Sequence, residues 1–240
     1  MLARQRLDKE VADRGLVATR SQAESFIRLG KVRVNGTILT KPGTMVSSEA
    51  DIRLLKVDQY VSRAGLKLAS VAKVLRLDFD KKIVLDVGSS TGGFTDYALR
   101  HGASKVLAVD VGTEQLHPSL RGDDRIELHE QTDIRHFTPR VTPDIVVVDV
   151  SFISLRDILP SVVKMCSNRS VIVAMCKPQF EVGSGSKHKG VIKNDKMRRD
   201  ILKDFEMWLK SMFVVLDKVD SDVSGAKGNT ERFYLLKKSV

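Results

Sequence analysis

The sequence predicts an α/β protein whose main part is a seven-stranded, mostly parallel sheet covered by helices, preceded by a small α+β domain. Three observations support this fold class. An apolar run, Ile83–Val87, ends in the glycine-rich turn Gly88-Ser-Ser-Thr-Gly-Gly93 and is followed by a helical segment. Further Val- and Ile-rich runs alternate with helical segments, as in parallel sheets buried on both faces. The first 58 residues instead contain two short helical patterns and an Asn-Gly hairpin signal.

Composition narrows the class of protein. The 240 residues, 42% of them apolar, suffice for one large and one small domain, which we expect at 63–240 and 1–58 with a short linker at 59–62. The net charge of +10 favours an anionic partner, nucleic acid before a membrane surface, although a basic enzyme without such a partner has the same composition.

Cysteine usage and hydropathy indicate the compartment. Cys166 and Cys176 do not form a C-x-x-C pair, and no apolar stretch approaches the ~18 residues that a membrane span needs. With no signal-peptide pattern at the start, a cytoplasmic protein with reduced cysteines is expected. The five histidines have no ligand spacing with the cysteines or with each other, so no metal site is predicted.

The elements of the small domain follow from local patterns. Residues 7–13 look helical and stop near Gly15. The capping-box sequence Ser21-Gln-Ala-Glu24 opens a second helix, which ends at Gly30. Residues 32–39 form a β-hairpin around Asn35-Gly36, and 52–55 form a closing strand.

Basic residues are concentrated on this small domain. Two short helices before an Asn-Gly hairpin, with Arg6-Leu-Asp-Lys, Arg20-Ser-Gln-Ala and Gly30-Lys-Val-Arg-Val-Asn-Gly36, resemble the S4 RNA-binding domain. The resemblance implies that folded RNA is held through phosphates and shape; a merely solvated basic face is the alternative. The residues expected to contact RNA are Arg4, Arg6, Arg20, Ser21, Arg28, Lys31, Arg33, Asn35 and Lys41.

Helices and strands alternate through the rest of the chain. Helices are expected at 62–76, 91–100, 154–165 and 196–210, and strands at 83–87, 106–110, 126–129, 145–149, 170–175, 213–219 and 233–237. No helix separates the last two strands, which predicts an antiparallel pair at one edge. Methyltransferase sheets have such an edge, and ordinary dinucleotide-binding sheets do not.

The loop after the first strand indicates the cofactor. Its spacing, Gly88-x-x-x-Gly92-Gly93, departs from G-x-G-x-x-G and favours S-adenosylmethionine over a dinucleotide. We expect the loop to hold the methionine part with Asp86 near its ammonium, Asp110 to hold the ribose, and Asp133 to meet the adenine. The complete predicted set is Asp86, Gly88, Ser89, Ser90, Gly92, Gly93, Phe94, Thr95, Asp110, Val111, Asp133, Ile134 and Asp149.

Four ionisable residues fall at or beside the strand ends where such sheets keep their active sites: Lys67, Asp149, Lys177 and Glu231. Their order matches the Lys-Asp-Lys-Glu tetrad of FtsJ-type RNA ribose 2′-O-methyltransferases. Together with the S4 pattern and the motifs Tyr60-Val-Ser-Arg-Ala-Gly-Leu-Lys67 and Lys177-Pro-Gln-Phe-Glu-Val-Gly183, they resemble the TlyA family, often labelled hemolysin A. The resemblance implies 2′-O-methylation of cytidine in ribosomal RNA, with rRNA or ribosomal subunits as partners and no obligatory protein partner.

Within that resemblance we expect Lys177 to be the general base. Lys67 and the sulfonium of the cofactor would favour its neutral form, while Asp149 and Glu231 orient the lysines and the ribose. Three alternatives remain open: ordinary ion pairs that close the end of the sheet, an RNA-binding assembly factor without catalysis, and a membrane-perforating hemolysin. The last is disfavoured because no long amphipathic helix carries the basic residues.

Overall fold

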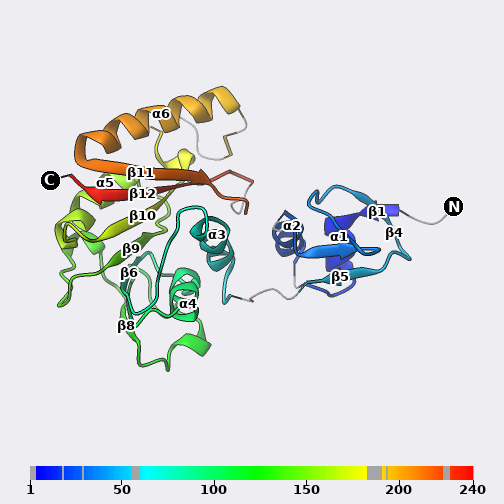
Figure 1. Cartoon of the computed structure of the whole chain (residues 1–240), viewed down its shortest axis with the longest axis horizontal. Coiled ribbons are helices and arrows are strands. Elements are labelled where there is room, and N and C mark those ends of the chain that lie inside the picture. Colours follow the sequence, from blue (N-terminus) through cyan, green and yellow to red (C-terminus); the bar gives the residue numbers. More distant parts are fainter. Residues whose placement is uncertain are drawn as a thin grey trace. The chain divides into compact units, whose positions relative to one another are not determined.

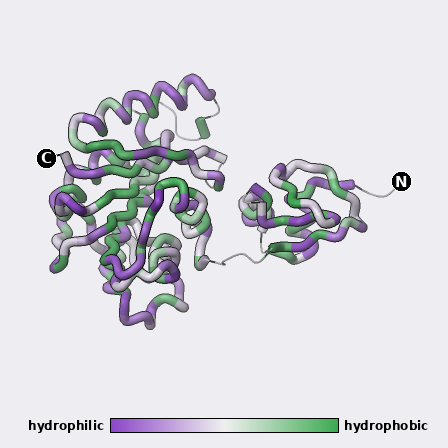
Figure 2. The backbone as a smooth tube through the Cα atoms, in the orientation of Figure 1, coloured by the Kyte–Doolittle hydropathy of each residue, from purple (hydrophilic) through white to green (hydrophobic). Residues whose placement is uncertain are grey.

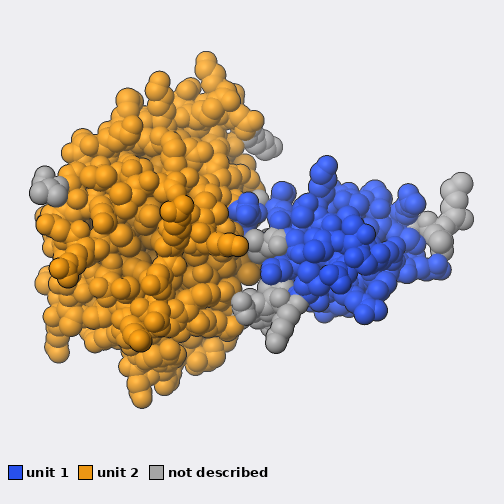
Figure 3. Space-filling view, viewed as in Figure 1, with its two compact units in different colours: residues 1–59, 222–226 blue, residues 60–221, 227–240 orange. Residues whose placement is uncertain are grey.

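The computed structural model describes residues 4–17, 19–28, 30–55, 60–182, 191–192, 194–223 and 228–239. The chain divides into two compact units, residues 1–59 with 222–226 and residues 60–221 with 227–240 (Figure 3).

The smaller unit has two helices and two small antiparallel sheets. Strand β1 pairs with β4, and β2 lies between β3 and β5. The elements are β1 (Arg4–Arg6), α1 (Leu7–Asp13), α2 (Arg20–Arg28), β2 (Val32–Val34), β3 (Thr37–Ile38), β4 (Met45–Ser47) and β5 (Ile52–Leu54). The predicted hairpin is confirmed, with Asn35 and Gly36 at positive φ in its turn.

The start of α2 differs from the prediction. The helix begins at Arg20, and Thr19 Oγ1 accepts a hydrogen bond from the Gln22 backbone N–H at 3.2 Å. Thr19 therefore caps the helix, and the predicted capping box at Ser21 is wrong, because Ser21 already lies inside the first turn.

The larger unit is built on one seven-stranded sheet (Figure 1). Its order is β11-β12-β10-β9-β6-β7-β8, and β12 runs antiparallel to both of its neighbours. The α-helices and strands are α3 (Arg63–Ala72), β6 (Ile83–Val87), α4 (Gly93–Arg100), β7 (Lys105–Val109), β8 (Ile126–His129), β9 (Ile145–Val148), α5 (Leu155–Val162), β10 (Val171–Cys176), α6 (Asp195–Met212), β11 (Phe213–Asp220) and β12 (Arg232–Lys238). Short 3₁₀ helices are η1 (Pro118–Leu120), η2 (Ile134–His136), η3 (Val163–Met165) and η4 (Pro178–Phe180). The predicted fold class and antiparallel edge pair are confirmed.

Alternate residues of the strands face two different cores. Leu85 and Val87 pack with buried residues of α5 and α6, whereas Val84 packs with those of α3 and α4. In Figure 2 the central strands are largely green, while α6 is mostly purple because few of its residues face the sheet. Strands buried on both faces need apolar residues at every position, which explains their continuous Val and Ile runs.

The topology brings several strand ends to one edge. Strands β6, β7, β9 and β10 are parallel neighbours, so the segments that follow them lie together. In the register of β10 with β12, Cys176 lies opposite Arg232. Lys177 directly follows Cys176 in the chain, and Glu231 directly precedes Arg232. The sheet thus assembles side chains from four distant parts of the sequence.

Candidate active site

The glycine-rich loop after β6 makes close backbone contacts. Gly88 has φ +80°, and a Cβ there would lie 2.6 Å from the Asp149 carbonyl oxygen, so glycine lets this loop approach the end of β9. A Cβ at Gly92 would meet Leu116 and Leu120, and one at Gly93 would lie 2.8 Å from Ala64 Cβ at the start of α3. The last two glycines therefore allow helix packing.

Two neighbouring cavities are lined in part by this loop. A larger one of about 520 Å³ and a smaller one of about 150 Å³ share Gly88, Ser90, Asp149 and Ser151 in their linings. Predicted cofactor residues in the larger cavity include Asp110, Val111, Asp133 and Ile134, and those in the smaller one include Asp86, Ser89 and Phe94. Gly92, Gly93 and Thr95 line neither cavity.

Asp86 is a fully buried carboxyl group in the smaller cavity. Its Oδ2 accepts a hydrogen bond from Thr95 Oγ1 at 2.7 Å, and its Oδ1 has no hydrogen-bond partner among the described residues. Burial, together with the nearby carboxylates of Asp149 and Asp110, raises the pKa of Asp86 to about 7 despite the Thr95 hydrogen bond. An unpaired buried acceptor of this kind fits a cationic donor.

Two further predicted acidic contacts, Asp110 and Asp133, are also held by hydrogen bonds. Asp110 follows β7 and accepts hydrogen bonds from the backbone N–H groups of Ser90 at 2.8 Å and Gly112 at 2.7 Å. Each carboxylate oxygen retains lone pairs that a ribose hydroxyl can use. Asp133 pairs with the Arg135 guanidinium at 2.6 Å, and this hydrogen bond lowers the pKa of Asp133 to about 2.

The two predicted lysines each pair with one predicted acid. Lys67 Nζ lies 2.6 Å from Glu231 Oε2, and Lys177 Nζ lies 2.7 Å from Asp149 Oδ1. Both lysine side chains are only 10% exposed. Lys177 also donates a hydrogen bond to Ser151 Oγ at 2.6 Å and lines the smaller cavity, which Asp86 also lines.

Sequence reasoning missed two aromatic residues beside this site. Phe152 is 91% exposed, has φ +65° and lines the larger cavity. Its ring centroid lies 5.4 Å from that of Phe180, in the segment after β10. A bulky residue in the left-handed region is strained, and such strain is concentrated at functional sites. Both residues lie in motifs that carry the family resemblance, Phe152 in Asp149-Val-Ser-Phe-Ile-Ser154 and Phe180 in Lys177-Pro-Gln-Phe-Glu-Val-Gly183, but a place in a motif alone gives no role.

Glu181 was also missed. Its carboxylate is buried and accepts hydrogen bonds from Ser154 Oγ at 2.5 Å and from the Leu155 N–H at 2.8 Å, at the start of α5. Burial raises the pKa of Glu181 even though these hydrogen bonds oppose the shift. This residue ties the segment that carries Lys177 to the segment that carries Asp149.

Residues 60–238 match the FtsJ-like methyltransferase family, and residues 5–52 match the S4 domain. This chain belongs to the FtsJ-like methyltransferase family. Its larger unit is therefore an enzyme domain, and the chain carries an S4 domain at its N-terminus.

Several relatives match most of this FtsJ-like chain. Hemolysin A of Brachyspira hyodysenteriae is 38% identical over 94% of this chain and 97% of that protein. The 16S/23S rRNA (cytidine-2′-O)-methyltransferase TlyA of Mycobacterium tuberculosis is 40% identical over 83% of this chain and 76% of that protein. A solved structure of a provisionally named hemolysin from Streptococcus thermophilus superposes with a TM-score of 0.72 at 36% identity, over 100% of this chain and 90% of that chain. The predicted resemblance to the TlyA family is confirmed.

In the S4 domain, two of the predicted RNA contacts also pair with an acid. Arg6 and Arg20 lie 3.0 and 2.8 Å from the Asp8 carboxylate, which is buried. Burial alone would raise the pKa of Asp8, but hydrogen bonds from the two arginines hold it at about 2. Both arginines stay about half exposed, so they can meet an anion as well.

The other predicted RNA contacts of the S4 domain are Asn35, Ser21 and five basic residues. Asn35 Oδ1 accepts a hydrogen bond from the Asp51 N–H at 2.8 Å, which holds the hairpin turn. The side chain of Ser21 lies outside the described residues. The remaining basic residues are exposed or half-buried: Arg4, Arg28, Lys31, Arg33 and Lys41.

The described residues contain neither a membrane-spanning helix nor a metal-binding group of side chains. None of the helices there combines the length and apolar character required to traverse a bilayer. No three His, Cys, Asp or Glu side chains in these ranges are grouped so as to hold a metal ion.

Proposed function

We propose that this FtsJ-like enzyme transfers a methyl group from S-adenosylmethionine to a ribose 2′-hydroxyl of ribosomal RNA, with cytidine as the expected nucleotide. The observation that carries the proposal is the position of Lys177. Its Nζ is 2.7 Å from Asp149, and it lines a cavity together with the glycine-rich loop after β6 and Asp86. In this proposal residues 1–58 capture the RNA, 59–62 link the domains and 63–240 perform the transfer. The cytoplasmic location stays a prediction.

The charge of the cleft supports this cofactor. Its lining has four carboxyl groups, those of Asp86, Asp110, Asp133 and Asp149. Its two cations, Arg135 and Lys177, are paired with Asp133 and Asp149, and the Oδ1 atom of Asp86 lacks a hydrogen-bond partner among the described residues. S-adenosylmethionine carries an ammonium and a sulfonium, which these carboxylates would attract, whereas the pyrophosphate of a dinucleotide would be repelled. When bound, this cofactor supplies an electrophilic methyl group. Asp86 and Ser89 would hold its amino-acid part, and Asp110 its ribose.

The four ionisable residues then have distinct roles. A ribose hydroxyl is a poor nucleophile until its proton leaves, and Lys177 Nζ is the group that accepts this proton. Asp149 and Ser151 fix the position of Nζ, and the carboxylate stabilises the positive charge that Lys177 gains. Glu231 orients Lys67 through their ion pair, so that the Lys67 ammonium remains directed toward the same end of the sheet.

Phe152 supplies a surface for the base of the target nucleotide. Its ring is exposed at the larger cavity and packs against Phe180. Unstacked bases are recognised on such aromatic rings, at about 1–3 kcal/mol per stacked base. Phe152→Ala should raise the KM for ribosomal RNA about tenfold or more. Isothermal titration of S-adenosylmethionine should change little; a loss confined to cofactor binding would contradict this role.

The proposed function is tested directly by methyl transfer. The purified chain is incubated with labelled S-adenosylmethionine and with small subunits, large subunits or free rRNA, and 2′-O-methyl positions are mapped. Label at one or more ribose 2′-oxygens is expected in at least one fraction. RNA binding without transfer in every fraction would instead support an assembly factor without catalysis.

A further inference from the structure

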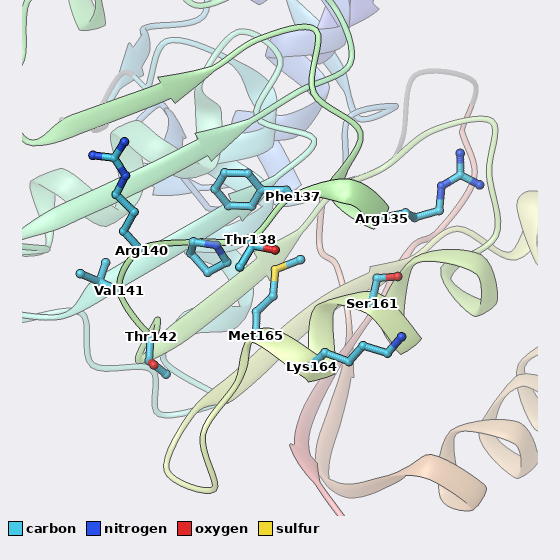
Figure 4. Close-up of a pocket in the computed structure, with 10 residues that line it drawn as sticks. Arg135, Phe137, Thr138, Arg140, Val141, Thr142, Ser161, Lys164 and Met165 are labelled. Carbon is cyan, nitrogen blue, oxygen red and sulfur yellow. The ribbon is translucent and has the colours of Figure 1, made fainter.

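A second hollow lies beside the cofactor cleft, on the side of η2 and the end of α5. It has a volume of about 330 Å³, and Arg135 belongs to its lining as well as to that of the larger cofactor cavity. Figure 4 shows Phe137 and Met165 within it, and both pack partly against the core between the sheet and α5. The hollow therefore rests on a rigid part of the fold.

Its rim is strongly basic. Arg135 and Arg140 stand at opposite ends of the hollow, and Lys164 lies along the segment after α5 (Figure 4). Arg135 is paired with Asp133, but in the described parts of the chain neither Arg140 nor Lys164 has a carboxylate partner. The hydroxyl-bearing residues Thr138, Thr142 and Ser161 also line the hollow, together with Pro139 and Val141. Cations and hydroxyl donors around one concavity attract an anion with several acceptor oxygens.

The methyl donor does not account for this rim. S-adenosylmethionine contains no phosphate, and its ammonium and sulfonium groups would be repelled by Arg140 and Lys164. Its carboxylate belongs to the amino-acid part, which the proposed function places in the smaller cavity, and neither Arg140 nor Lys164 lines that cavity. The remaining reactant is the RNA, whose only anionic groups are its backbone phosphates. Phosphate contacts position a protein on a nucleic acid and carry most of the salt-dependent affinity.

We infer that this hollow, which we name the basic pocket (Arg135, Arg140 and Lys164 with Thr138, Thr142 and Ser161), holds a backbone phosphate of the RNA substrate. The inference rests on the proposed function, since it assumes that an RNA strand enters the cleft next to Arg135. The basic pocket then fixes the strand outside the target nucleotide, while Lys177 acts on the ribose. Because the basic pocket contacts phosphate and not the bases, it increases the affinity for RNA and fixes the position of the strand, but it adds no sequence preference.

The test compares two double variants of equal charge change. Arg140→Gln/Lys164→Gln removes the two unpaired cations of the pocket, and Lys203→Gln/Lys210→Gln removes two exposed cations of α6, which does not line the pocket. Binding of a fluorescein-labelled single-stranded RNA of about 20 nucleotides is measured between about 0.05 and 0.2 M KCl. The slope of log affinity against log salt should become shallower by about 0.7 in the pocket variant, the value for one phosphate contact on a single strand, and stay unchanged in the α6 variant.

Methyl transfer separates this inference from the proposed function. With ribosomal subunits as substrate, the pocket variant should show a several-fold higher KM, with kcat and the affinity for S-adenosylmethionine unchanged. If the wild-type chain methylates rRNA but both variants keep its salt slope and its KM, the phosphate site is wrong and the proposed function stands. If the wild-type chain methylates no fraction, the proposed function fails, and the slope comparison alone decides the phosphate site.

Discussion

Replacing Lys177 by alanine is expected to lower the single-turnover rate of methyl transfer by about 10²–10⁴-fold, the range that a positioned general base contributes. The reason is geometric: Lys177 Nζ is held by Asp149 and Ser151 in the cavity next to the cofactor loop. The measurement is a rapid-quench time course with enzyme in excess over ribosomal subunits.

Lys177→Arg separates base catalysis from charge. Arginine keeps the positive charge and can pair with Asp149, yet it does not lose its proton in proteins. If Lys177 is the base, the arginine variant should be nearly as slow as the alanine variant. Activity within about tenfold of wild type in Lys177→Arg would assign Lys177 an electrostatic role only.

Melting curves are needed for both variants. Lys177→Ala leaves the largely buried carboxylate of Asp149 without its partner, a change that destabilises proteins by about 3–5 kcal/mol. Lys177→Arg retains a cation there, so it should melt closer to wild type. A slow but stable arginine variant therefore cannot be explained by unfolding.

Long apolar strands were the part of the fold that the sequence predicted best. The range 83–87 agrees with β6 residue for residue, because an apolar run between turn residues leaves little choice of structure. The range 126–129 agrees with β8, where apolar and polar residues alternate. Strands β1 and β4 went unpredicted. Each has three residues, too few for a recognisable alternation, and each is defined by pairing with the other across the small unit.

The residues of the candidate site could be predicted where they lie at or near the end of a strand. Asp86, Asp110, Asp149 and Lys177 could be named because parallel topology fixes where those ends meet. The sequence did not reveal which acid each lysine contacts, since the pairing of Lys67 with Glu231 depends on how α3 packs. The basic pocket could not be predicted for the same reason: it forms where the segment from Arg135 to Thr142 meets η3, which carries Lys164.

Asp86→Asn is expected to stabilise the protein and to weaken its cofactor binding. The pKa of Asp86, about 7, stands about three pH units above its ordinary value, and each pH unit corresponds to about 1.4 kcal/mol. At pH 8 the ionised, buried carboxylate therefore destabilises the fold by up to about 4 kcal/mol. Asparagine has nearly the same shape and can still accept the hydrogen bond from Thr95, so most of this destabilisation should disappear in chemical denaturation.

The pH dependence of stability has a definite sign. Folding raises the pKa of Asp86, so the folded state binds its proton more tightly than the unfolded state does. The Asp86 contribution to the free energy of unfolding is therefore lost as pH rises from about 4 to about 7. The stability difference between Asp86→Asn and wild type should be small near pH 4, grow through this window and level off above pH 7. Asp124→Asn, an exposed site with the same change of charge, should show no such growth.

The same substitution should weaken cofactor binding while it stabilises the fold. A hydrogen bond between a carboxylate and an ammonium group contributes about 1.5–3 kcal/mol to binding. Asp86→Asn should therefore bind S-adenosylmethionine about 10–100-fold more weakly than the wild type at pH 7 and above. Below pH 7 the wild-type carboxyl becomes protonated, and its affinity should fall toward that of the variant. Titration calorimetry should show the two curves converging near pH 5.5.

Two curves that stay parallel down to that pH would remove Asp86 from the cofactor site, even if the variant were more stable. Convergence together with higher stability would mean that the enzyme keeps a destabilising buried acid because its free Oδ1 is the group that recognises the cofactor.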